Sequence, residues 1–205
     1  MSRPATRHAE KIARLARRAG VLLPRDLDRH RIPRMALARM QTRGELERIG
    51  HGLYSLPGTA GSTVHQSLIE VAKRTPRAVA CLLTALRFHD LTTQAPFEIW
   101  IALPRGAWRP RFDYPPLRVM RFSGNALTEG VEKHLINGVE VRVYGVAKTV
   151  ADCFKYRNKI GLDVALEALR EARREKHVTS DEIWKYAKIC RVAKVMLPYV
   201  QSFGA

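Results

Sequence analysis

The side chains best suited to bind another molecule are arginines between residues 31 and 48. A helix opened by Pro33, at about 100° per residue, would carry arginines and small or polar residues along one side. That side comprises Arg34, Met35, Ala38, Arg39 and Thr42. A guanidinium can hold guanine O6 and N7 or a phosphate oxygen. We therefore predict that Arg34, Arg39 and Thr42 face the major groove of double-stranded DNA.

Further cationic or titratable side chains flank the predicted helix, and we expect them near phosphates. They are Arg31, Arg43, Arg48 and His51. The alternative is a solvated helix face, which is the ordinary interpretation of a lone basic helix. The surrounding sequence favours DNA, because helices are expected before this segment and a hairpin after it.

The elements around the basic helix predict a compact DNA-binding unit. Two further helices are expected at residues 6–19 and 25–30. Gly44 ends the basic helix as a C′ glycine does, and two short runs around the glycine-flanked break at residues 50–52 predict a hairpin. Three helices followed by a hairpin are typical of a winged helix-turn-helix, whose second helix of the pair enters the major groove.

The charge balance supports a polyanionic partner. The 205 residues carry a net charge of +17. The first 57 residues hold thirteen cations against five acids, which is close to half of that net charge. Such an excess is costly to a compact fold and commonly marks nucleic acid as the partner. Most of the cations are arginine, which suits phosphate and base contacts, although a high-GC genome would produce the same bias.

Membrane and metal functions find little support in the composition. The longest apolar-leaning run, residues 78–86, is far shorter than the roughly 20 residues of a membrane span. No signal-peptide pattern opens the chain, so we expect a cytoplasmic protein. Cys81, Cys153 and Cys190 are odd in number and far apart, which predicts neither disulfides nor a zinc site. No cofactor is expected.

The small polar stretch 58–63 predicts a linker between a DNA-binding domain, residues 1–58, and a second domain, residues 63–205. The second domain alternates expected helices and strands, which makes the fold class α+β with a small, mostly antiparallel sheet. The expected helices are 64–74, 78–91, 148–156, 162–175, 180–190 and 192–203. The expected strands are 97–103, 117–122, 131–136 and 139–144, the last two joined by the type I′ turn Asn137-Gly138.

One loop of the second domain mixes cations with aromatic side chains. Its candidate contact residues are Arg105, Trp108, Arg109 and Arg111. Such a mixture can stack on bases and hold a phosphate backbone. It could equally bind a protein partner, or Trp108 and Tyr114 could simply pack on the sheet.

An enzyme is the alternative to a binding protein. A nuclease would need grouped acids or a metal cluster. Glu98 lies on an expected strand, but no lysine follows it at the spacing of a restriction-type nuclease, and the seven histidines are scattered. A metal-dependent nuclease acting through Glu98 and the basic loop therefore stays the second hypothesis, behind a protein without catalytic residues.

Three segments carry a family resemblance. They are RGELERIGHGLYSLP at the end of residues 37–57, VACLLTALRFHDL with EIWIA in residues 79–102, and VEVRVYGVAKTVADC at residues 139–153. Together they resemble the AbiEi-type antitoxins of type IV toxin–antitoxin (abortive infection) systems. The likeness spans most of the chain in order, although no one of the three motifs is decisive alone.

The resemblance implies a regulator of two parts. The N-terminal winged helix would bind repeats in its own promoter, expected to be inverted, and repress the operon. The C-terminal part would counteract a cognate nucleotidyltransferase toxin without requiring a stable complex. The wing tip, usually basic in the family, is His51 here. A plain winged-helix transcription factor without a toxin is the remaining alternative.

Overall fold

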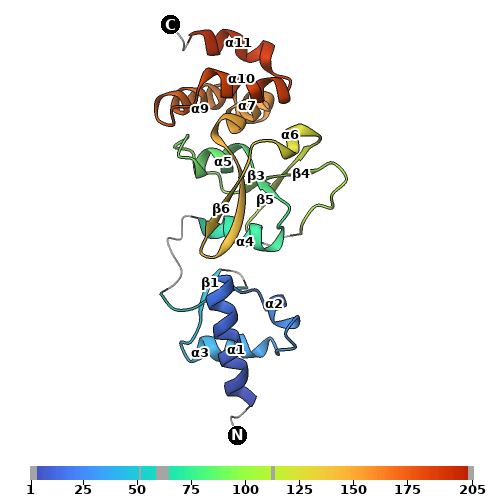
Figure 1. The fold of residues 1–205 in the computed structure, drawn as a ribbon, viewed down its shortest axis with the longest axis vertical. Helices are drawn as coiled ribbons and strands as arrows, with labels where there is room; N and C mark the ends of the chain where they lie inside the picture. The colour runs from blue at the N-terminus through green and yellow to red at the C-terminus, as the bar shows by residue number, and fades with distance from the viewer. Residues whose placement is uncertain (1–3, 51, 59–64, 112–113, 203–205) are drawn as a thin grey trace. The chain divides into compact units, whose positions relative to one another are not determined.

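The computed structural model describes residues 4–50, 52–58, 65–111 and 114–202 of the chain. Helices and strands make a mixed α+β fold, as predicted (Figure 1). The chain divides into two compact units, Met1–Pro76 with His134–Val141 and Arg77–Lys133 with Arg142–Ala205. Apart from Gly58, the predicted linker at residues 58–63 lies outside the described residues.

The first unit contains the helices and the hairpin expected near the N-terminus. Its elements are α1 (Pro4–Ala19), α2 (Pro24–Asp28), α3 (Met35–Thr42), β1 (Glu47–Gly50), β2 (Leu53–Ser55) and α4 (Gln66–Arg74). Apolar side chains from α1, α2 and α3 meet in one core. Its buried members are Ile12, Ala16, Leu22, Leu27, Ile32, Leu37, Met40 and Leu46. Burial of these side chains positions the short helices, which would be marginal alone.

The start of α3 lies slightly later than Pro33. The Pro33 carbonyl accepts a hydrogen bond from the Ala36 N–H at 2.9 Å, so a turn begins at the proline. Regular α-helix then runs from Met35, with Arg34 as the residue before it. A proline at this point costs no hydrogen bond, because the first N–H groups of a helix have no partner within it.

Gly44 ends α3 as predicted. Its φ is +71°, its N–H donates to the Gln41 carbonyl at 2.9 Å, and the Glu45 N–H donates to the Met40 carbonyl at 2.8 Å. This pair of bonds is a Schellman motif, which places a left-handed residue just after the helix. The sharp turn directs the chain straight into β1.

Gly44→Ala is expected to lower the free energy of unfolding by about 1 kcal/mol. A Cβ at Gly44 would meet nothing within 4 Å, so the cost comes from the positive φ alone. Urea unfolding followed by circular dichroism measures it. Gly106→Ala is the matched control, because that position is equally open and has no positive φ. Equal midpoints for the two variants would show that the α3 turn tolerates alanine.

A third segment extends the β1–β2 hairpin. β1 and β2 are antiparallel, with Arg48 opposite Tyr54 and an irregular register between Arg48 and Gly50. Leu22 and Tyr54 exchange two backbone hydrogen bonds of 2.8 and 2.9 Å. A bridge of one residue carries no periodicity, so the sequence did not predict this pairing. The bridge ties the hairpin to the α1–α2 connection.

The second unit is organised around a five-stranded sheet, of which residues 134–141 in the β6–β7 hairpin are grouped with the first unit. The strands are β3 (Val79–Ala80), β4 (Ile99–Pro104), β5 (Leu117–Phe122), β6 (Val131–Ile136) and β7 (Val139–Tyr144), in the order β5-β4-β3-β7-β6. β3 pairs antiparallel with β4, but β4–β5 and β3–β7 are parallel. The prediction of a mostly antiparallel sheet was therefore wrong. About a dozen residues, 105–116, join β4 to β5, enough for the return that a parallel pair needs.

The helix predicted over residues 78–91 divides into a strand and a helix. β3 occupies its first residues, and α5 (Leu82–Phe88) follows. The Cys81 N–H still donates to the Trp100 carbonyl at 3.0 Å, so this segment is paired with β4 before it becomes helical. A short, wholly apolar run has no periodicity that separates a buried strand from a buried helix.

Apart from α6, which lies between β5 and β6 in the chain, the remaining helices follow β7 and form the C-terminal part of the second unit (Figure 1). They are α6 (Asn125–Thr128), α7 (Val146–Lys155), α8 (Arg157–Ile160), α9 (Leu162–Arg174), α10 (Ser180–Ile189) and α11 (Ala193–Ser202). α7 packs against α5, α9 and α10. α10 begins with a capping box, in which the Glu182 N–H donates to Thr179 Oγ1 at 3.2 Å and the Thr179 N–H donates to the Glu182 carboxylate at 2.8 Å.

Candidate nucleic-acid interface

Helix α3 has one exposed side and one buried side. Leu37 and Met40 are buried in the core of the first unit. The exposed side consists of Arg34, Met35, Ala38, Arg39 and Thr42, the residues predicted to share it. The predicted division of the helix is therefore confirmed. Met35 is 67% exposed, which is unusual for so large an apolar side chain.

Arg39 is the best-placed arginine for contact with a ligand. It lies on the second turn of α3 and is exposed, and its side chain makes no hydrogen bond or ion pair with any described residue. Its neighbours on this side, Met35 and Ala38, leave the guanidinium sterically accessible. All five of its N–H donors are thus available to base edges or phosphates.

Arg34 is held by an acid within the first unit. Its Nε donates to Asp28 Oδ1 at 3.0 Å, and its Nη2 donates to Asp28 Oδ2. This two-point contact with the guanidinium lowers the pKa of Asp28, chiefly through the hydrogen bond. The pair joins the last turn of α2 to the start of α3, while the remaining guanidinium N–H groups are left for another acceptor.

The other predicted contact residues are also exposed, but most have internal partners. Thr42 Oγ1 donates to the Ala38 carbonyl at 3.0 Å, Arg43 Nε lies 3.0 Å from Glu45 Oε1, and Arg48 Nε donates to the Gly50 carbonyl at 3.2 Å. Arg31 is exposed at a φ of +54° in the α2–α3 turn. His51 lies outside the described residues.

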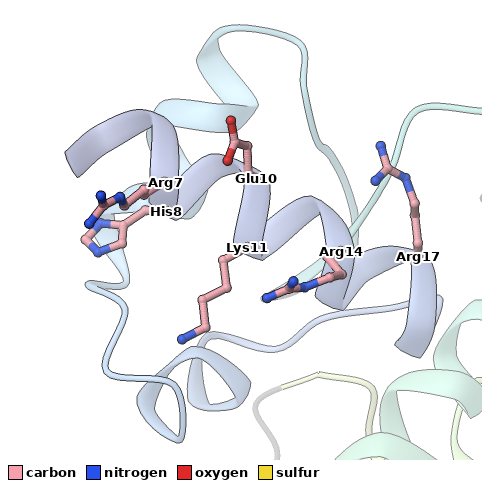
Figure 2. A pocket seen from close by; sticks show the side chains of 6 residues that line it. All are labelled: Arg7, His8, Glu10, Lys11, Arg14 and Arg17. Atoms are coloured by element: carbon pink, nitrogen blue, oxygen red, sulfur yellow. The ribbon is translucent and has the colours of Figure 1, made fainter. Parts of the chain in front are cut away.

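Helix α1 supplies basic residues that we did not assign to an interface from the sequence. Figure 2 shows six side chains that project from this one helix and line a pocket of about 660 Å³. They are Arg7, His8, Glu10, Lys11, Arg14 and Arg17. Lys11 Nζ donates a long hydrogen bond of 3.5 Å to the His30 carbonyl in the α2–α3 turn. The sequence predicts this helix, but it does not show that Lys11 lies beside the α2–α3 turn.

Two aromatic side chains of the basic loop in the second unit are exposed. Trp108 is 94% exposed and Tyr114 is 58% exposed, so neither packs on the sheet. Arg109 Nη2 donates to the Leu117 carbonyl at 3.3 Å, whereas Arg105 and Arg111 are exposed. Exposure is compatible with both hypotheses for this loop, contact with a nucleic acid and contact with a protein.

The acid proposed for a nuclease has a structural partner. Glu98 Oε1 accepts a hydrogen bond from Arg118 Nε at 2.8 Å, across the parallel strands β4 and β5. Within the described part of the chain, no three His, Cys, Asp or Glu side chains are grouped so that they could hold a metal ion. Nor is any helix there long and apolar enough to cross a membrane.

A buried ion pair is the most unusual group of charges in the second unit. Lys148 Nζ contacts Asp152 Oδ2 one helical turn along α7, and both side chains are almost fully buried. Cys190 Sγ donates to Asp152 Oδ1 at 3.2 Å. Lys148 Nζ also lies 4.1 Å from the ring centre of Tyr144 and 4.9 Å from that of Phe122. Burial raises the pKa of Asp152, and the attraction of Lys148 opposes that rise.

Comparison with known proteins bears on the first unit. No curated protein matches the chain. The family resemblance is confirmed for one segment, which includes α2, α3 and the β1–β2 hairpin: residues 10–57 match the model of the transcriptional regulators described as AbiEi antitoxin.

Proposed function

We propose that this protein is a type IV antitoxin that binds its own promoter and represses the operon. In this proposal α2 and α3 form the helix-turn-helix and the β1–β2 hairpin is the wing. The C-terminal part counteracts a nucleotidyltransferase toxin encoded beside it, without a permanent complex. Such a regulator acts in the cytoplasm, where its operon lies.

The exposed arginine side of α3 is the observation that carries the DNA-binding part. The buried side packs against the core through Leu37 and Met40, so the outer side projects on a rigid support. Arg39 is available there, and Arg34, Arg43 and Arg48 flank it. The family match covers this same segment. A rigid helix that presents an available guanidinium is what sequence-specific contacts in the major groove require.

The basic residues of α1 support phosphate contacts next to the α2–α3 turn. Lys11 is hydrogen-bonded to the α2–α3 turn, and Arg7 and Arg14 lie along the same helix (Figure 2). Each phosphate neutralised releases a counterion, so the affinity should fall steeply as salt rises, with a slope of about −0.9 per contact.

A mobility-shift titration of the full-length protein tests the DNA-binding part. The probes are its own upstream region and an unrelated promoter of equal length, each at several salt concentrations. We expect tighter binding to the upstream region and a steep loss of affinity with salt. Equal affinity for both probes would contradict operator recognition and leave only a non-specific nucleic-acid binder.

The antitoxin part needs a separate test, because a plain repressor would pass the first one. A nucleotidyltransferase gene beside this one is expected, and its expression alone should arrest growth. Co-expression of this protein from an unrelated promoter should restore growth. Continued arrest with the protein present at normal levels would favour a transcription factor without a toxin.

A further inference from the structure

A second basic site lies within the second unit and includes Arg105 of the basic loop. It is a pocket of about 520 Å³ lined by residues from β5, α6, α7 and α10 and from the segments that follow β4, β5, α7 and α10. We propose that this pocket binds a small phosphate-bearing molecule of mononucleotide size. This proposal does not rest on the antitoxin function.

Four cations from separate parts of the chain converge on the pocket. Arg105 follows β4, Arg121 lies on β5, Lys155 ends α7, and Arg191 follows α10. Asp152 is the one acid among the lining residues, and it is already paired with Lys148. The positive charge of the lining is therefore largely uncompensated, which favours a ligand with several negative charges.

The cations are available to a ligand. Arg105, Lys155 and Arg191 are exposed and make no hydrogen bond or ion pair with another described side chain. Arg121 is oriented instead, because its Nη1 donates to the Pro104 carbonyl at 2.9 Å. One positioned arginine and three exposed cations can surround a phosphate without first breaking internal ion pairs.

The location agrees with the usual site of ligands on parallel strands. β4 and β5 are parallel from the Ile99–Leu117 pair to the Pro104–Phe122 pair, so their carboxyl ends lie at one edge of the sheet. Arg105 and Ser123 come directly after those ends. Open sheets bind ligands in the crevice outside the carboxyl ends of their strands, where backbone and loop groups converge.

The rest of the lining fits a nucleoside better than bare phosphate. Ser123 and Asn125 offer hydrogen-bonding side chains, and Phe122 and Tyr156 give apolar area. Burial raises the pKa of Tyr156 to about 12, with Arg105 opposing the rise, so its phenol stays protonated. The volume lies in the range of small-molecule sites and is too small for a duplex.

Isothermal titration of the full-length protein, without DNA, tests the proposal. The probes are ADP, ribose 5-phosphate and pyrophosphate at moderate ionic strength. We expect one ADP per chain. Because each lost charge-assisted bond is worth about a tenfold change, Lys155→Gln and Arg105→Ala should each weaken binding about tenfold. The matched controls Lys194→Gln and Arg87→Ala, also exposed on the second unit, should bind as the parent does.

The outcomes show which part of the ligand the pocket binds, and whether the ligand binds in the pocket or on the exposed side of α3. Equal binding of pyrophosphate and ADP would support a site for phosphate groups alone, and tighter binding of ADP would add contacts to the nucleoside. Failure of all three probes to bind would overturn the proposal. So would ADP binding that the pocket variants leave unchanged but Arg39→Ala abolishes, since the nucleotide would then lie on the DNA surface.

Discussion

Arg39→Ala is expected to weaken binding to the operator by about 1–3 kcal/mol and to relax the preference for one sequence. The guanidinium is exposed on a rigid helix and has no partner among the described residues, so its donors can all be used on DNA. Affinity for unrelated DNA should change much less. Mobility-shift titrations with the operator and with a base-substituted operator measure both effects.

A single change at Arg39 is a cleaner test than one at Arg34. Removing Arg34 would also leave Asp28 without its partner at the α2–α3 turn, so lost binding could reflect local structure. Arg87→Ala on the second unit is the matched control and should bind the operator normally. Unchanged operator affinity in Arg39→Ala would refute the assignment of this residue. An equal loss on both DNAs would make Arg39 a phosphate contact instead.

Lys148→Met is expected to destabilise the second unit by about 3–5 kcal/mol. The substitution keeps the volume similar but leaves the Asp152 carboxylate buried without its cation. It also removes the ammonium from the faces of Tyr144 and Phe122. Because domains are stable by only about 5–15 kcal/mol, the loss should be plain in urea unfolding followed by circular dichroism.

The double variant Lys148→Met, Asp152→Leu separates the two causes of that loss. With both charges removed, no unpaired charge stays buried, and most of the lost stability should return. Arg174→Ala is the surface control, because this exposed arginine pairs with Glu171 at 3.4 Å and with Glu175 at 2.8 Å, and exposed pairs are each worth less than about 1 kcal/mol. A double variant as unstable as Lys148→Met alone would show that packing, rather than the unpaired charge, sets the cost.

Local patterns in the sequence determined most elements and the faces of the helices. The period of α3 was sufficient to separate Leu37 and Met40 from the arginine side, because burial selects residues at helical spacing. Gly44 and the capping box at Thr179 marked helix ends, since both act through bonds within a few residues. The β6–β7 turn was equally local, with positive φ at Asn137 and Gly138.

Tertiary structure alone decided which distant groups meet. β3 is a strand because it lies between β4 and β7, and its two residues carry no pattern of their own. The hydrogen bonds from Arg34 to Asp28 and from Cys190 to Asp152 depend on how the chain turns back on itself, which the spacing of these residues in the sequence does not reveal. The convergence of four cations at the ends of β4 and β5 is of the same kind. Periodicity reports the side of an element that is buried, but pairing between elements depends on long-range packing that the period does not contain.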